Sequence, residues 1–126
     1  MSEIQAIILT CPDIPLEKTY SVFLETELNI YAVTLKTIEG GIKTLFDGGV
    51  ARDQIFSEIE ILLGQDAIPK IILVGHAHCP GRSVKEQDNR ELEVELRHVV
   101  SALHAKFPRQ VVEAYLKDNT QFIKVI

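Results

Sequence analysis

Several features that would direct a chain to a membrane, a secretory route or a nucleic acid are missing from this sequence. No apolar run approaches the roughly 20 residues that cross a bilayer. The N-terminal Met1-Ser2-Glu3 has neither the basic region nor the cleavage site of a signal peptide. The net charge is −5 and no basic run offsets it, which argues against nucleic acid or anionic lipid as a partner. We therefore expect a cytoplasmic protein.

Cysteine is also scarce, because the chain has only two, Cys11 and Cys79. In a reducing compartment, two cysteines serve as ligands, nucleophiles or core thiols rather than as a disulfide. The sequence also lacks internal repeats and low-complexity segments. With 126 residues, of which 46% are hydrophobic, residues 1–126 are expected to form a single domain around one core.

Apolar runs alternate with glycine and proline along the chain, and together they predict strands and helices in turn. The expected strands are 5–10, 30–35, 70–74, 111–116 and 121–126. The expected helices are 14–28, 51–63 with Gly64 as its stop, and 89–107 before Pro108. Paired glycines at 40–41 and 48–49 act as breakers between these elements.

The last of these helices has a clear apolar stripe and two histidines, His98 and His104, that lie away from it. The stripe consists of Leu92, Leu96, Val99, Val100, Leu103 and Phe107.

This alternation predicts an α/β fold with a mostly parallel sheet of about five strands and helices on both faces, in three layers. The expected strand order is 2-1-3-4-5, and the last strand returns antiparallel as a hairpin. In that order the first and third strands are neighbours, and the loops that follow them diverge. Ligands bind at such a switch point.

Metal-ligand side chains follow these two neighbouring strands. The apolar run in residues 71–81 ends in His76, His78 and Cys79, and the run in residues 7–10 leads into Cys11 and Asp13. Two thiolates, an imidazole and a carboxylate are ligand types that zinc prefers. The sequence therefore predicts a zinc site formed by Cys11, Asp13, His76 and Cys79.

Simpler interpretations of the same residues exist. Either thiol alone is more often a core residue than a ligand. Cys79 could instead be a nucleophile without a metal, although nothing would then explain why Cys11 and Asp13 share its site. His78 is either a proton shuttle or, more simply, a polar loop residue.

The two-part ligand pattern resembles the β-class carbonic anhydrases. That family carries a Cys-x-Asp-x-Arg loop after one strand and a Gly-His-x-x-Cys loop after another, and residues 11–15 (CPDIP) and 75–79 (GHAHC) are similar to them. Residues 36–41 (KTIEGG) look like a loose version of the family's Arg-x-Ala-Gly-Gly/Asn segment, and residues 114–120 (AYLKDNT) look like its closing hairpin. The resemblance thus covers nearly the whole chain.

The resemblance implies that Cys11, His76 and Cys79 hold zinc and that a bound water, ionised to hydroxide, hydrates carbon dioxide to bicarbonate. It also implies a homodimer or a higher homo-oligomer. In the family, the Asp of the first loop either pairs with the loop's Arg or becomes the fourth ligand, so Asp13 is the candidate catalytic residue. An open site with two thiolates predicts activity that rises toward alkaline pH.

The chain departs from the family at three points. Pro15 stands in place of the arginine, Pro80 stands in place of a glycine after the second cysteine, and Cys11 comes too early for an N-terminal arm. Without a guanidinium partner, Asp13 is free to close the zinc shell. The alternative function is therefore a non-catalytic protein with a closed Cys-Asp-His-Cys site and a structural, anion-binding or protein-interaction role. Lys36 could replace the arginine, although a surface lysine is the simpler interpretation.

Overall fold

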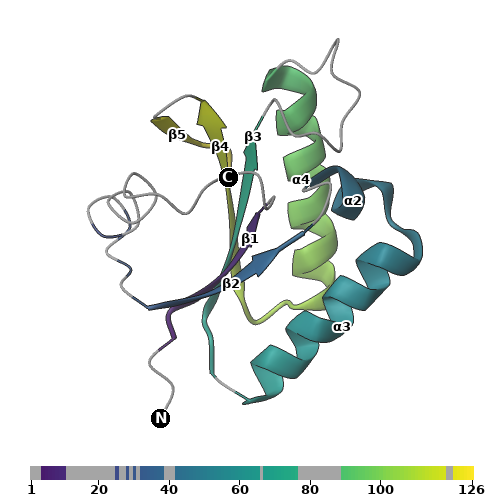
Figure 1. Cartoon of the computed structure of the whole chain (residues 1–126), viewed down its shortest axis with the longest axis vertical. Coiled ribbons are helices and arrows are strands. Elements are labelled where there is room, and N and C mark those ends of the chain that lie inside the picture. Colours follow the sequence, from purple (N-terminus) through teal and green to yellow (C-terminus); the bar gives the residue numbers. More distant parts are fainter. Residues whose placement is uncertain are drawn as a thin grey trace.

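A computed structural model describes residues 4–10, 25, 28, 30, 32–38, 42–65, 67–76, 89–118 and 121–126. The strands are β1 (Ala6–Thr10), β2 (Val33–Thr37), β3 (Lys70–His76), β4 (Val111–Asp118) and β5 (Gln121–Lys124). The helices are α2 (Ile42–Asp47), α3 (Gly49–Gln65) and α4 (Asn89–Lys106) (Figure 1). Among the helices of these residues, none is both long and apolar enough to cross a membrane.

The sheet has the strand order β2-β1-β3-β4-β5. β1 pairs in parallel with β2 and β3, β3 pairs in parallel with β4, and β5 runs antiparallel to β4. The predicted α/β class, strand order and closing antiparallel strand are therefore confirmed. Because the central strands β1 and β3 have core on both faces, their runs are almost continuously apolar rather than alternating.

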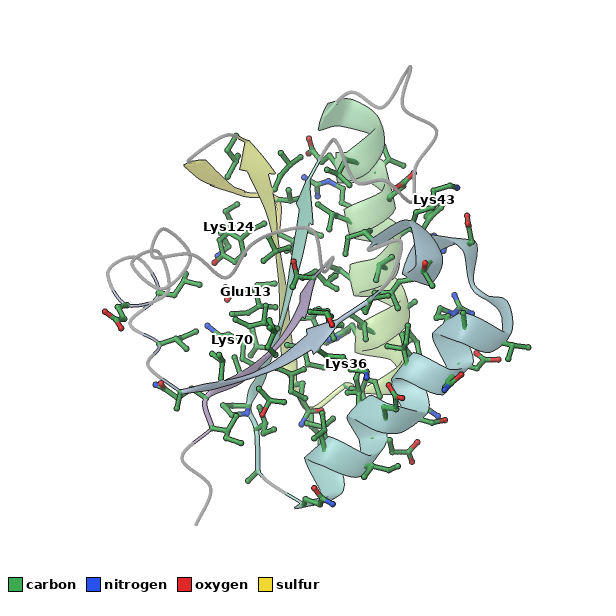
Figure 2. All side chains as sticks on the ribbon, viewed as in Figure 1. Lys36, Lys43, Lys70, Glu113 and Lys124 are labelled. Carbon is green, nitrogen blue, oxygen red and sulfur yellow. The ribbon has the colours of Figure 1, made fainter. Side chains whose placement is uncertain are left out.

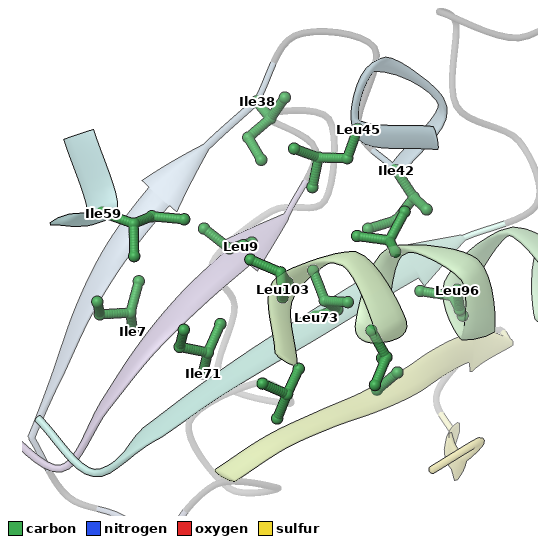
Figure 3. Packing of buried hydrophobic residues seen from close by; sticks show 14 of the residues in the cluster. Ile7, Leu9, Ile38, Ile42, Leu45, Ile59, Ile71, Leu73, Leu96 and Leu103 are labelled. Carbon is green, nitrogen blue, oxygen red and sulfur yellow. The ribbon is translucent and has the colours of Figure 1, made fainter. Parts of the chain in front are cut away.

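The larger core lies between the sheet and all three helices, which cover the same face (Figure 1). Alternate residues of β1 and β3, namely Ile7, Leu9, Ile71 and Leu73, point into this core (Figure 3). All six residues of the stripe predicted on α4 are buried there, as expected from their helical spacing.

The opposite face, called here the second face, carries a smaller apolar cluster. It contains Ala6, Ile8, Ile30, Ile72, Val74 and Tyr115, with Leu28, Val33 and Leu35 packed against it. The helix expected at 14–28 lies outside the described residues except for Glu25, which is helical, and Leu28.

Several element boundaries differ from the prediction, and one short helix was not predicted. β2 begins at Val33 rather than at residue 30, and β3 runs through Gly75 to His76 instead of ending at Val74. The unpredicted helix is α2. The predicted breaker at Gly48 and Gly49 lies at the junction of α2 and α3. These glycines have φ values of 76° and 75°, which only glycine adopts without strain.

Candidate metal site at the carboxyl edge of the sheet

The predicted site lies at the edge of the sheet where β1 and β3 end. Thr10, the last residue of β1, pairs with Val74 of β3. Cys11 follows Thr10 directly, and His76 comes two residues after Val74 and ends β3. The fold therefore brings Thr10 and Val74, which precede the two groups of candidate ligands, to adjacent positions on one edge, which is the step that the ligand prediction required.

The ligand geometry itself falls outside the described residues. Cys11, Asp13 and Cys79 lie there, as do His78, Pro15, Pro80 and the side chain of His76. In the part of the chain that the structure describes, no three His, Cys, Asp or Glu side chains form a group that could hold a metal ion. The four-ligand zinc site thus remains a prediction about residues at a known edge.

A row of five residues crosses the second face at this edge, and the register places them side by side. From β2 to β5 they are Thr37, Thr10, Val74, Tyr115 and Lys124. Thr10 is 1% exposed and Tyr115 is 3% exposed. Burial, together with the nearby Glu113 carboxylate, raises the pKa of Tyr115 to about 12, so the phenol stays protonated at neutral pH.

The hydroxyl of Thr10 is the feature of this row that the sequence analysis missed. Its Oγ1 is buried and has no hydrogen-bond partner within the described part of the chain. The backbone carbonyl of the same residue accepts a hydrogen bond of 2.7 Å from Ile38 N–H, so the carbonyl is satisfied whereas the hydroxyl is not. A polar residue at the end of an apolar strand, directly before a candidate ligand, was the available signal.

A charged cluster on the second face is centred on Glu113, two residues before Tyr115 on β4 (Figure 2). The carboxylate of Glu113, 14% exposed, lies 3.0 Å from Lys70 Nζ and 3.2 Å from Lys124 Nζ. Burial alone would raise the pKa of Glu113, but the two ammonium groups outweigh it and hold the pKa below its usual value. Glu113 is therefore ionised at neutral pH, and both lysines are engaged.

Lys36, considered in the sequence analysis as a replacement for the arginine of the resembling family, lies on the other face of the sheet. It pairs with Leu9 on β1, whose side chain points toward the helices. Its ammonium forms an ion pair with Glu58 of α3. Lys36 therefore ties β2 to α3 and does not extend over the second face.

Gly75 has a packing role that the sequence analysis did not identify. A Cβ at this position would lie 3.1 Å from Leu92 Cδ1 and 3.3 Å from Ile42 Cγ1, closer than carbon atoms normally approach. The glycine thus lets α2 and α4 close over the end of β3. It continues the strand to His76 instead of ending it.

His98 and His104 are exposed on α4, away from the apolar stripe, as predicted. The ring of His98 packs edge-on against Phe46, with centroids 5.1 Å apart. Neither histidine lies on the sheet edge that carries the candidate site.

Comparisons with known proteins identify no relative: no family model, no curated protein and no solved structure matches this chain.

Proposed function

We propose that this protein binds one zinc ion at the carboxyl edge of β1 and β3 and hydrates carbon dioxide there. The observation that carries the proposal is the in-register pairing of Thr10 with Val74. It would let the segment that begins with Cys11 and the segment that follows His76 reach a common point. Two thiolates, an imidazole and a carboxylate from those loops suit zinc.

The residues proposed to hold the metal are Cys11, His76 and Cys79, with Asp13 in reach of the fourth position. Zinc would supply a Lewis acid that makes water a nucleophile near neutral pH. The chain would supply the position of the ion, through strand ends anchored in a rigid sheet. The substrate is a small neutral molecule, carbon dioxide, and the product is bicarbonate. A reducing cytoplasm is the proposed compartment because it keeps both thiols available.

Zinc content per chain tests the metal site. We expect one zinc per wild-type chain after loading and dialysis, and loss of it in Cys11→Ser, Cys79→Ser and His76→Gln. His104→Gln is the matched control, because His104 is exposed on α4, away from this edge. A wild-type chain that retains no zinc, or a His76→Gln variant that retains as much as His104→Gln, would refute the site.

Stopped-flow hydration of carbon dioxide by the zinc-loaded protein tests the activity. Two anionic thiolates offset the charge of the ion, so we expect the rate to rise toward alkaline pH. A rate that stays flat from about pH 6.5 to 9 would contradict that reasoning.

A second candidate function, a closed and non-catalytic zinc site, is favoured by Pro15. With no guanidinium at that position to pair with it, Asp13 would complete a Cys-Asp-His-Cys shell. The variant Pro15→Arg separates the two functions. A charge-assisted pair contributes about 1.5–3 kcal/mol, which corresponds to roughly 10- to 100-fold in an equilibrium. If the site is closed, Pro15→Arg should raise the hydration rate by about that factor at unchanged zinc content. Equal rates in an active wild type and the variant would indicate an open site.

A further inference from the structure

We propose that the hydroxyl of Thr10 donates a hydrogen bond to a metal-bound thiolate at this edge and so positions the ligand set. The inference deepens the proposed function and rests on it. Thr10 is a positioning residue in this proposal, since it acts on the metal through a ligand.

The first argument is the state of the hydroxyl. Thr10 is 1% exposed, so water does not satisfy its Oγ1, and no partner for that atom exists among the residues described. Buried hydroxyls in native proteins nearly always have a partner, because an unsatisfied one destabilises the fold. A hydrogen-bond acceptor that takes up its position only when the metal binds would explain why the Thr10 hydroxyl has no partner here.

The second argument is its place in the fold. Thr10 ends β1, shares the second face with Val74 of β3, and is joined directly to Cys11. Its neighbours in the row across the sheet offer no alternative for this role: Val74 is apolar, and Thr37 on β2 is exposed to water. Thr10 is thus the one buried hydroxyl of β1 and β3 at the edge where the candidate ligands begin.

The third argument is chemical. A metal-bound thiolate is anionic and accepts hydrogen bonds, and such bonds orient the ligand and tune its basicity. Two of the four candidate ligands are thiolates, and a threonine hydroxyl is a neutral donor that adds no charge to a shell already neutralised by them. The buried hydroxyl of Thr10, which directly precedes Cys11, is a donor that could form such a hydrogen bond.

The test compares Thr10→Val, which keeps the shape and removes the hydroxyl, with Thr10→Ser, which keeps the hydroxyl. Thr34→Val is the matched control, because Thr34 pairs with Ile7 on the helix-covered face, away from the edge. Each variant is measured in the metal-free form by thermal unfolding and then titrated with zinc. Cobalt substitution reports on the thiolates through their charge-transfer absorption band.

Two effects of opposite sign are expected from Thr10→Val. The metal-free protein should unfold about 4 °C higher or more, because an unsatisfied buried hydroxyl has been removed. Zinc affinity should fall about 10- to 100-fold, the usual loss when a partner of a metal ligand is removed. The cobalt-thiolate band should move to lower energy, because the thiolate loses a hydrogen bond. Thr10→Ser should keep wild-type zinc affinity, and Thr34→Val should change neither zinc affinity nor the band.

The outcomes separate this inference from the zinc proposal. If the wild type binds zinc and Thr10→Val binds it equally well, or with an unmoved cobalt band, the role of Thr10 is refuted and the zinc site stands. A metal-free Thr10→Val that unfolds at a lower temperature than wild type also refutes it, since the hydroxyl then has a partner without metal. A wild type without zinc refutes both proposals.

Discussion

Replacement of Gly75 by alanine offers a sharp test of how the end of β3 is built. The new methyl group would lie 3.1 Å from Leu92 Cδ1 and 3.3 Å from Ile42 Cγ1. Carbon atoms pack best at about 3.5–4.0 Å, so both neighbours must move by a few tenths of an ångström. Such overpacking of a close-packed core costs about 1–3 kcal/mol.

Part of that cost is offset in the unfolded chain. The φ of Gly75 is outside the left-handed region, so alanine fits the backbone. Alanine also lowers the conformational entropy of the unfolded chain, which stabilises the folded protein by about 0.4–1 kcal/mol. The net expectation is a loss of about 1–2 kcal/mol in the free energy of unfolding. For a domain of this size it lowers the melting temperature by about 3–10 °C.

A double-mutant cycle with Leu92→Val isolates the contact. Valine lacks the Cδ atoms that approach position 75, and alone it should cost about 1 kcal/mol for the lost methylene. In the double variant, the alanine methyl occupies space that Leu92 has left. The combined loss should therefore be smaller than the sum of the two single losses by about 1 kcal/mol.

Gly64→Ala is the control for the cycle, because nothing lies within 4 Å of a Cβ there. Since Gly64 is in α3, alanine should stabilise the protein by up to about 1 kcal/mol. Chemical denaturation measures all four variants. If Gly75→Ala is as stable as wild type, or if its effect adds to that of Leu92→Val, the close approach of α4 to β3 is not the reason for this glycine.

Three further perturbations address the turn and the charges on the second face. Gly49→Ala has open space for its Cβ but a φ of 75°, so denaturation should show a loss of about 1–2 kcal/mol from backbone strain alone. Because the folded pKa of Glu113 is lowered, its carboxylate stabilises the fold above its unfolded pKa of about 4.3 and loses that contribution as pH falls through the folded value. The stability difference between wild type and Glu113→Gln should therefore shrink on acidification, and a difference independent of pH would contradict the ion pairs. The folded pKa of Tyr115 is raised to about 12, so its contribution should be complete below about pH 10 and decline from there to about pH 12. Tyr115→Phe should remove that part of the alkaline decline in stability; an unchanged decline would refute the shift.

The topology could be predicted because local signals agreed with one another. Runs such as those of β1 and β3 are apolar on both faces, which marks central parallel strands, and the stripe on α4 has clear helical spacing. Right-handed crossovers then leave few possible strand orders. The order found is the one that brings Thr10 beside Val74.

The boundaries that were wrong depend on contacts between distant residues. Ile30 is buried, yet it packs on the second face before β2 begins, and hydrophobicity alone does not separate the two situations. β2 continues to Thr37, two residues past its predicted end, because its backbone pairs with β1 as far as Thr10. α2 is only six residues long and is held by Ile42 and Leu45 against the core, so its own sequence gives a weak signal.

Only part of the candidate site could be predicted from the sequence, because the rest depends on contacts between distant residues. Ligand types and spacing are local, so Cys11, Asp13, His76 and Cys79 were visible in the sequence, whereas the packing role of Gly75 and the orphaned hydroxyl of Thr10 appear only when β1, β3 and the helices are assembled. The signal for Thr10, a single polar residue at the end of an apolar strand, is common to many strands and carries no ligand information alone.

The charges that surround the edge bear on whether the proposed site is open or closed. An open site needs a cation that draws Asp13 away from the metal. The sheet lysines whose side chains the structure describes are engaged elsewhere: Lys36 pairs with Glu58 on the helix-covered face, and Lys70 and Lys124 share Glu113. Releasing either of the latter would leave Glu113 with a weaker counter-charge in a site only 14% exposed, which is unfavourable. Under the proposed zinc site, the cations of the described sheet would thus be poor substitutes for the arginine of the resembling family, and the closed shell would be the resting state. In that proposed state the Thr10 hydroxyl would act on a fixed thiolate, so the effect of Thr10→Val on zinc affinity should persist in Pro15→Arg even if the hydration rate rises.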